Sequence, residues 1–211
     1  MDDARSKLIP YIVKPKTMGN SQNVTRNLQL PPSAKEQQHW LRDTLIEEFV
    51  EGYEVTVPVI FDAIIDDYVV CPPIIYVPEV TDPTAWFLSY EEKMDRKVVI
   101  DRRVGRLDPS ATKALLDASR SYNSRGLARY DFRWRVSEIK ADLVKLDDLW
   151  FLEINCMPTL RTDVNFLKSL KDYLARRSDT LSKFVMEAGS PDIGALSYLL
   201  FQFFLATATT K

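Results

Sequence analysis

The residues best suited to chemistry lie in two short segments in the second half of the chain. Arg129 and Asp131 stand at one end of a candidate strand, and a second candidate strand ends with Glu153 and Asn155. A polar stretch rich in turn-competent residues, 137–148, separates them. If the strands form an antiparallel hairpin in even register, Asp131 faces Glu153. Arg129 then faces Asn155, and because side chains alternate across a strand, all four point to one face.

The two faces of this predicted hairpin differ in character. The other face collects the apolar residues Tyr130, Phe132, Trp134, Trp150, Leu152 and Ile154. On the polar face, two opposed carboxylates repel unless a cation lies between them, and oxygen ligands without His or Cys suit Mg²⁺. Mg²⁺ held by few protein ligands usually shares its shell with phosphate oxygens. The two segments therefore suggest nucleotide chemistry.

Three further features are compatible with an ATP site. Lys14 ends a predicted strand beside a polar loop, 18–23, whose backbone N–H groups can face phosphate. Lys93 lies in a charged loop from which it can reach a γ-phosphate. Glu54 begins a strand and can accept hydrogen bonds from ribose hydroxyls. The strand end that can hydrogen-bond an adenine comprises Glu47, Glu48, Phe49 and Val50.

Each of these features also has a purely structural interpretation. Lys14 can be a solvated strand end, and the glutamates at 47, 48 and 54 can form a solvated face. The carboxylates of Asp131 and Glu153 can likewise lie on a solvated face of a sheet. This interpretation does not explain why several candidate ATP-binding segments occur together in one order along the chain.

Composition limits the remaining classes of function. The 211 residues can form one large domain or two small ones, and a net charge of -2 gives no sign of a nucleic-acid binder. Cys71 and Cys156 are too few for a disulfide framework and favour a reduced, cytoplasmic protein. The lone His39 cannot build a zinc site or a His-based triad. Residues 1–10 lack a signal peptide, and the apolar run 193–206 is too short to span a membrane, so we expect a buried terminal helix.

Strand and helix patterns segregate along the chain. Strands are predicted over 9–13, 45–50 and 54–61, with a turn at Gly52, and an extended stretch over 68–80. Helices are predicted over 33–43, 110–122 and 163–177, with a short one within 81–97. In the helix over 110–122, the apolar side carries Leu115, Leu116 and Ala118. This segregation favours an α+β fold over a wound βαβ sheet.

In this order, the segments resemble the ATP-grasp superfamily, and most closely the D-alanine–D-alanine ligases. The resemblance covers about residues 9–170. Its most specific part is the pair Ala-Arg-x-Asp and Glu-x-Asn-x-x-Pro at their spacing. The matching segments are 11–15, 45–54, 90–93, 128–131 and 152–158.

The resemblance implies a role for each matching residue. Lys14 and Lys93 hold the phosphates of ATP, residues 47–50 line the adenine pocket, and Glu54 binds ribose. Arg129 stabilises charge that develops in the transition state. The residues that ligate two Mg²⁺ ions, or Mn²⁺ as an alternative, are Asp131, Glu153 and Asn155. In this family ATP phosphorylates a carboxylate, and an amine then attacks the acyl phosphate.

The resemblance also implies two α+β subdomains with ATP in the cleft between them. We expect a central subdomain over 1–107 that is incomplete at its N-terminus, and a C-terminal subdomain over 108–211 with the metal site and terminal helices. Family members begin with a further domain, and Met1 lies shortly before the Lys14 segment. The chain is then a fragment, an incomplete gene product or a reduced member, completed by another chain or by a second copy of itself.

Several positions depart from the family pattern. Asn20 replaces a serine in the glycine-rich loop, Asn23 replaces a glycine, and Met94 replaces a tyrosine. Residues 159–161 lack the Gly-Met-Thr that follows the family's metal segment, and Val164 stands where a serine grips the second amino acid. A buried hydroxyl can hydrogen-bond a substrate carboxylate and a valine cannot, so D-alanine is not expected to be the acceptor.

Two function hypotheses follow. The first is an ATP-dependent ligase that joins a small-molecule carboxylate to an amine through an acyl phosphate, or the ATP-binding part of one. The alternative is an ATP-binding module or pseudoenzyme that acts as a partner subunit. Neither hypothesis involves nucleic acid or a membrane.

Overall fold

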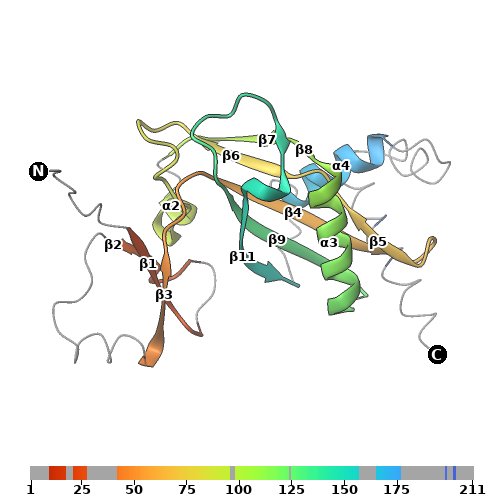
Figure 1. Ribbon diagram of the computed structural model, residues 1–211, viewed down its shortest axis with the longest axis horizontal. Helices are drawn as coiled ribbons and strands as arrows, with labels where there is room; N and C mark the ends of the chain where they lie inside the picture. The colour runs from red at the N-terminus through yellow and green to blue at the C-terminus, as the bar shows by residue number, and fades with distance from the viewer. Residues whose placement is uncertain are drawn as a thin grey trace, which may run out of the picture.

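The computed structural model describes residues 10–17, 21–27, 42–95, 98–123, 125–156 and 165–176, together with Tyr198 and Gln202. Within these residues, the strands form a small sheet, a large sheet and a two-stranded parallel pair (Figure 1). None of the helices described here is long and apolar enough to cross a membrane.

The small sheet carries the first group of predicted nucleotide ligands. Its order is β2-β1-β3, and both pairings are antiparallel. Its strands are β1 (Tyr11–Pro15), β2 (Thr25–Asn27) and β3 (Thr44–Glu48). Few of its side chains are buried, and Tyr11 and Val13 alternate toward its covered face.

The large sheet carries the second group. Its order is β11-β9-β4-β6-β7, with β5 paired to β4 beside β6, and every pairing is antiparallel. Its strands are β4 (Tyr53–Asp62), β5 (Asp67–Val70), β6 (Ile74–Pro78), β7 (Ile100–Val104), β9 (Leu127–Trp134) and β11 (Leu149–Asn155). Short elements complete the description: α2 (Tyr90–Asp95), β8 (Arg106–Leu107), β10 (Leu143–Val144) and the 3-10 turn η1 (Leu146–Asp148).

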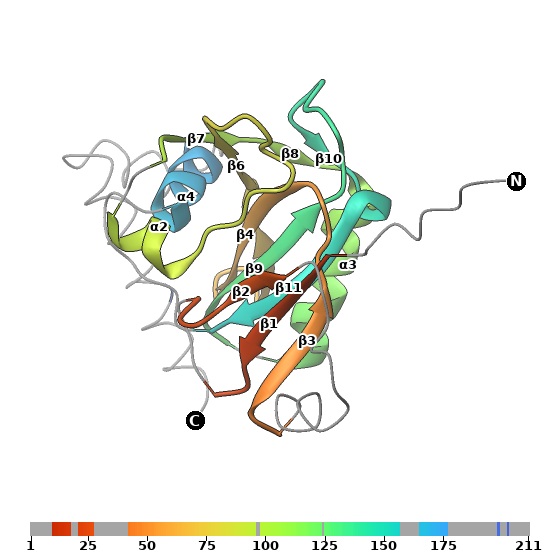
Figure 2. The same ribbon diagram turned by 90° about the vertical axis from the view of Figure 1, so that its left-hand side faces the viewer.

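Two helices cover opposite faces of the large sheet (Figure 2). Leu115 of α3 (Pro109–Tyr122) packs with Val55, Val57 and Tyr130 on one face. On the other face, Leu167, Leu170 and Leu174 of α4 (Asn165–Arg176) pack with Ile60. Because β4 is covered on both faces, nearly all of its side chains are buried. The face covered by α4 carries polar side chains at its other end, around Glu54.

The structure differs from the predicted strand pattern around Gly52. The predicted strands on either side of Gly52 belong to different sheets, since β3 pairs with β1 while β4 pairs with β5, β6 and β9. Gly52 therefore lies in a linker between sheets rather than in a hairpin turn. Its φ of 144° lies in the region that favours glycine.

The predicted division of the chain near residue 107 has no counterpart in the sheet order. Strands β4, β6 and β7 precede that position, and β9 and β11 follow it, yet all belong to the large sheet. Among the described residues, the change from one sheet to the other falls at Gly52 instead. The sheet order alone does not define subdomains, and the division near residue 107 stays a prediction.

Other predicted elements are confirmed with small changes. The extended stretch 68–80 is interrupted by Cys71, Pro72 and Pro73 and becomes β5 and β6. In α3, Leu115 is buried, but the prediction for Ala118 was wrong because Ala118 is exposed, and Ser119 takes the inward position. The helices predicted over 33–43 and 193–206 lie outside the described residues except at Arg42, Asp43, Tyr198 and Gln202.

A side-chain cap starts α3. Asp108 has extended backbone angles, and its Oδ1 accepts a hydrogen bond of 2.7 Å from the backbone N–H of Ala111. Replacing Asp108 by Ala should lower the free energy of unfolding by about 1 kcal/mol, because a helix N–H loses its partner. Chemical denaturation measures this, with the exposed Ser110→Ala as control. Equal effects of the two substitutions would contradict the assignment.

Candidate active site

The large sheet brings Glu54, Asp131 and Glu153 to one face in two cross-strand rows. In the first row, Glu153 lies opposite Asp131, and Asp131 lies opposite Thr56. In the second row, Arg133, Glu54 and Tyr76 lie opposite one another in turn. Directly opposed residues share a face of an antiparallel sheet. The two rows are two residues apart along β4 and along β9, so the side chains of both rows point to the same face.

The predicted register of the two chemistry-bearing strands is confirmed. Asp131 pairs with Glu153, and Arg129 pairs with Asn155. A β-bulge then interrupts the pairing at Leu152, and Phe151 rather than Leu152 lies opposite Phe132. The prediction that Trp150 joins the apolar face was therefore wrong, and Leu152 has no partner that fixes its face. Trp150 lies opposite Arg133 on the polar face, since the extra residue shifts the alternation by one position.

Asp131 is held by two neighbours. Arg129 donates a forked pair of hydrogen bonds to it, with Nε 2.8 Å from Oδ1 and Nη2 2.7 Å from Oδ2. Thr56 donates from Oγ1 to Oδ1 at 2.7 Å. The charge of Asp131 is thus compensated by a guanidinium, where sequence reasoning expected a metal to provide that compensation.

The donor atoms around Asp131 and Glu153 fit a hard cation. The two side chains offer carboxylate oxygens from paired strands, and Asn155 offers an amide oxygen one alternation further along β11. No cluster of three or more His, Cys, Asp or Glu side chains occurs in the described part of the chain. A metal there would thus have few protein ligands, which suits Mg²⁺ shared with a phosphate.

Glu54 is a largely buried carboxylate. Its Oε1 accepts a hydrogen bond of 2.7 Å from the backbone N–H of Leu88 and lies 3.7 Å from Arg133 Nη1. Burial raises the pKa of this carboxyl, and the positive charge of Arg133 offsets only part of the effect. The folded protein thus maintains a carboxylate at a position where ionisation costs free energy.

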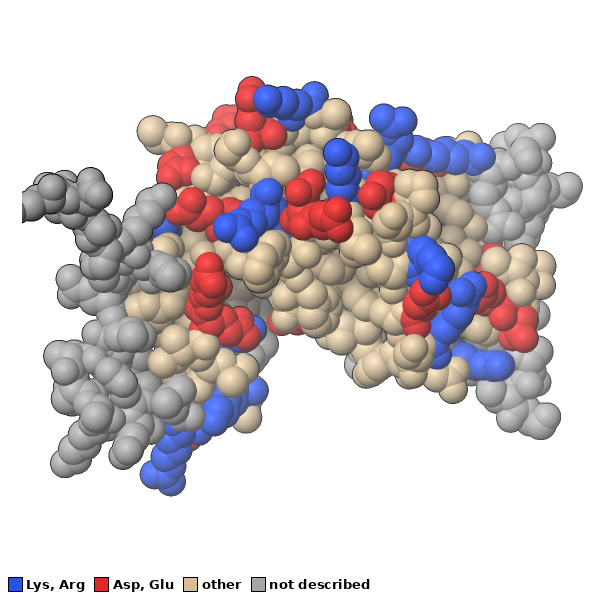
Figure 3. Space-filling model, in the orientation of Figure 1, with Lys and Arg blue, Asp and Glu red and all other residues tan. Residues whose placement is uncertain are grey.

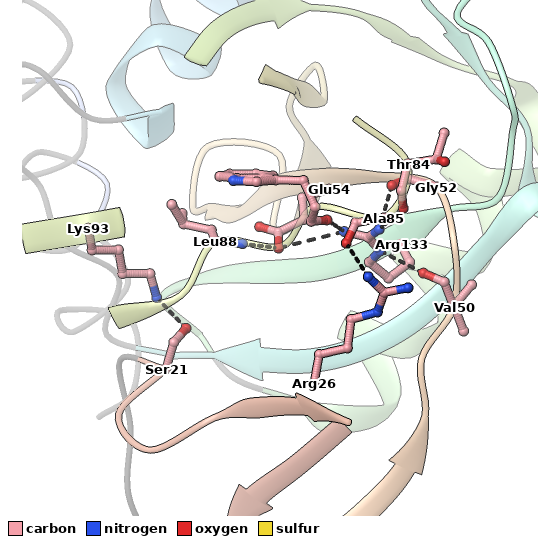
Figure 4. Close-up of polar contacts among 11 residues, drawn as sticks. Ser21, Arg26, Val50, Gly52, Glu54, Thr84, Ala85, Leu88, Lys93 and Arg133 are labelled. Atoms are coloured by element: carbon pink, nitrogen blue, oxygen red, sulfur yellow. Dashed lines mark hydrogen bonds and ion pairs between the residues drawn. The ribbon is translucent and has the colours of Figure 1, made fainter. Parts of the chain in front are cut away.

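Lys93 joins α2 to the loop after β1. Its Nζ donates a hydrogen bond of 2.7 Å to Ser21 Oγ (Figure 4). Burial lowers the Lys93 pKa, while the nearby carboxylates of Glu54, Glu153 and Asp131 raise it. The hydrogen bond to Ser21 ties the helix that carries Lys93 to the loop beside the small sheet.

Lys14 lies on the small sheet. Its Nζ forms an ion pair of 2.7 Å with Glu47 across β1 and β3, and both side chains are partly exposed. The adjacent Glu48 is exposed as well. In the space-filling view the surface is indented between the region of the small sheet and the large sheet (Figure 3). Lys14 and Glu47 belong to the small sheet beside that indentation.

The strand end after Glu48 turns inward. Phe49 is 5% exposed, and its backbone N–H donates to the carbonyl of Pro10 at 2.9 Å. The Phe87 ring meets it edge-on at 6.4 Å, and the guanidinium of Arg26 lies over it at 4.4 Å. These contacts fix the chain at 47–50 against the loop 84–88.

Sequence reasoning missed Arg133. This residue is 3% exposed and donates to the backbone carbonyls of Val50, Trp86, Thr84 and Gly52. The missed signal was the alternation of Arg129, Asp131 and Arg133, which places three charged residues on one face of one strand. Its partners lie far away in sequence, so the pattern indicated its face but not its contacts.

The raised pKa of Glu54 gives a pH-dependent prediction. The folded protein holds this proton more tightly than the unfolded chain does, so its stability should fall as pH rises through the interval between the two pKa values. The free energy of unfolding of the wild type should therefore decrease, relative to Glu54→Gln, as the pH rises above about 4, where an ordinary glutamate ionises. Denaturation across this range tests the effect, with the exposed Glu51→Gln as control. A pH-independent difference would contradict it.

Comparisons with known proteins agree with this geometry. The family model described as D-ala D-ala ligase C-terminus matches residues 3–178. A search of curated proteins finds no significant match. Among solved structures, the D-alanine–D-alanine ligase of Bacillus anthracis complexed with ATP is 19% identical, with a TM-score of 0.53. The match covers 99% of this chain and 58% of that protein.

Two further ligases are similar. The VanG D-Ala:D-Ser ligase of Enterococcus faecalis is 15% identical with a TM-score of 0.53, over 92% of this chain and 49% of that one. The D-alanyl-alanine synthetase A of Vibrio cholerae is 15% identical with a TM-score of 0.53, over 92% of this chain and 54% of that one. The chain thus spans about half the length of these proteins. It belongs to the family of D-alanine–D-alanine ligase C-terminal domains, and the predicted α+β ATP-grasp fold is confirmed.

Proposed function

We propose that this chain is the ATP-binding part of an ATP-dependent carboxylate–amine ligase. The observation that best supports it is that one face of the large sheet places Asp131 opposite Glu153 and carries Arg129 and Glu54 beside them. Such a set of alternating charges suits a polyphosphate that is accompanied by a metal. Membership of the family supports the same function, and it disfavours the alternative of a binding module without ligase activity.

The nucleotide would be bound by groups from both sheets and from α2. Lys93 and Lys14 would contact phosphate oxygens, and the ammonium of Lys93 is already anchored by Ser21. The backbone at 47–50 would hydrogen-bond the adenine edge, backed by the buried Phe49 ring. Glu54 would accept hydrogen bonds from the ribose hydroxyls.

The metal would be held by side chains of β9 and β11. Asp131, Glu153 and Asn155 would provide oxygen ligands for Mg²⁺, with Mn²⁺ as an alternative. When bound, such an ion neutralises charge on the transferring phosphoryl group. Engagement of Asp131 by a cation would release Arg129 from its present fork, and Arg129 would then stabilise charge on the phosphoryl oxygens.

The reaction would proceed in two steps. A carboxylate oxygen of the first substrate attacks the γ-phosphorus of ATP, which forms an acyl phosphate and releases ADP. The amine of the second substrate then attacks the acyl carbon, loses a proton and expels phosphate. In both steps Arg129 and Lys93 would hold the charged oxygens in place and thereby orient the reactants.

The proposal extends to the substrates and to the protein that completes their binding sites. The chain spans about half the length of the similar ligases. We propose that protein corresponding to the rest of that length completes the substrate sites, whether in the same polypeptide, in another chain or in a second copy. Small-molecule substrates suit this family. The prediction that D-alanine is not the acceptor depends on Val164, which lies outside the described residues. Two free cysteines, Cys71 and Cys156, are consistent with the cytoplasm.

Calorimetric titration with a non-hydrolysable ATP analogue tests the proposal. Binding should be observed with Mg²⁺ or Mn²⁺ and should weaken strongly when EDTA removes the metal. Absence of binding under both conditions would overturn the assignment. ADP release that depends on both a carboxylate and an amine, measured for the longest available form of the protein, separates a ligase from a binding module.

A further inference from the structure

Arg133 is the most heavily bonded side chain in the described part of the site, and the reaction proposed above does not use it. Its guanidinium is almost fully buried, and it lies opposite Glu54 in the second cross-strand row. A buried guanidinium is costly to desolvate unless its N–H groups all find partners. The arrangement of those partners therefore indicates what the residue does.

Backbone carbonyls use most of the donors of Arg133. Its Nε donates to Val50 at 2.9 Å, and Nη1 donates to Trp86 at 2.9 Å. Its Nη2 donates both to Thr84, at 2.8 Å, and to Gly52. A guanidinium has five N–H groups, so about one remains, and Nη1 directs it toward Glu54 Oε1 at 3.7 Å.

These four carbonyls come from two segments that approach the nucleotide site from different directions. Val50 and Gly52 belong to the linker after the adenine-binding strand end. Thr84 and Trp86 belong to the loop that leads to Leu88 and on to Lys93. Arg133 fastens the two segments to each other, with Glu54 beside the junction (Figure 4).

The contacts also fix the direction of Glu54. Its Oε1 is held by the Leu88 N–H and by the charge of Arg133. No residue in the described ranges donates a hydrogen bond to its Oε2, and the side chain remains 20% exposed. One oxygen is thus anchored to the protein while the other is left for a ligand.

We propose that Arg133 is a positioning residue for ribose recognition, which holds the carboxylate of Glu54 and the two segments around it in the geometry that binds the sugar hydroxyls. This inference rests on the proposed ATP-binding function and extends it to a residue outside the nucleotide contacts. Arg133 acts through Glu54, and the ligand class that it selects is a ribonucleoside triphosphate rather than its deoxy analogue.

A lysine cannot replace Arg133 in this role. Its single ammonium has three donors around one nitrogen, whereas the planar guanidinium spans carbonyls on several sides and lies over the Phe49 ring at 5.1 Å. Arg133→Lys keeps the charge and the length but loses the fork. It is the conservative variant that separates charge from geometry.

The experiment compares calorimetric affinities for Mg-ATP, 2′-deoxy-ATP and 3′-deoxy-ATP, each as a ratio within one variant. The wild type should prefer ATP over at least one deoxy analogue by about tenfold, which corresponds to one hydrogen bond to a charged group. Arg133→Lys and Glu54→Gln should each bring that ratio close to one. The double variant should lose no more than either single variant. The control is Arg135→Lys, since Arg135 is exposed, lies over Trp150 at 5.4 Å and takes no part in the network.

Glu54→Asp supplies a second test that leaves Arg133 in place. Shortening the side chain keeps the charge but draws it away from Leu88 and Arg133, so the discrimination should fall as it does in Arg133→Lys. Retained discrimination in either variant would overturn the inference, and so would a wild type that binds ATP and both deoxy analogues equally. A wild type that binds no nucleotide would instead remove the proposed function.

Discussion

Replacing Asp131 by Asn together with Glu153 by Gln should abolish metal-dependent nucleotide binding. The two residues are directly opposed on β9 and β11 and are the only carboxylates in their cross-strand row within the described residues. An amide oxygen can ligate a hard divalent ion but lacks the negative charge of a carboxylate, so replacing both carboxylates removes the charge that attracts the ion. We expect the affinity for a non-hydrolysable ATP analogue with Mg²⁺ to fall by about 100-fold or more, as for the loss of two charge-assisted contacts.

Calorimetry with and without EDTA measures this loss, and two exposed residues supply a charge-matched control. Asp147→Asn with Glu138→Gln removes the same number of carboxylates from positions away from this row. The control should bind like the wild type. If the Asp131 and Glu153 double variant kept both its affinity and its response to EDTA, the two carboxylates would be a solvated face of the sheet and the metal site would be elsewhere.

Replacing Gly52 by Ala should destabilise the protein by about 4 kcal/mol, which is the scale of severe single-site strain. A Cβ atom at this position would lie 2.1 Å from the carbonyl oxygen of Trp134, and the backbone φ of 144° is unfavourable for any other residue. Backbone atoms block the new methyl group, so no side-chain movement can relieve the clash. The linker that carries the Val50 and Gly52 carbonyls would have to shift away from β9.

Urea denaturation gives the loss, and Gly126→Ala is the matched control. A Cβ at Gly126 meets nothing within 4 Å, so its substitution should change stability by less than about 0.5 kcal/mol. Nucleotide affinity of any folded Gly52→Ala protein should fall as well, because the carbonyls that accept from Arg133 move. A stable Gly52→Ala variant with unchanged affinity would show that the linker geometry is unimportant.

Local patterns were sufficient to predict most of the longer elements and the central pairing, but not β7. The alternation along β9 and β11 predicted that Asp131 faces Glu153, because a two-residue period leaves few registers for a polar and an apolar face. The helix over 110–122 begins and ends within a residue of its prediction, since its apolar spacing is contained in adjacent residues. The order of short segments likewise indicated the family, because each of those segments is a run of adjacent residues.

The tertiary structure decided what depends on distant residues. The bulge at Leu152 reverses the faces of Trp150 and Phe151, because one extra residue shifts the alternation. A bulge is defined by pairing with the partner strand, so the sequence of one strand alone does not reveal it. The assignment of β3 and β4 to separate sheets depends on their partners rather than on their own sequences. Arg133 bonds to carbonyls 47 to 83 positions away, which no local pattern specifies, since every backbone carbonyl is an equivalent acceptor until the fold brings it close.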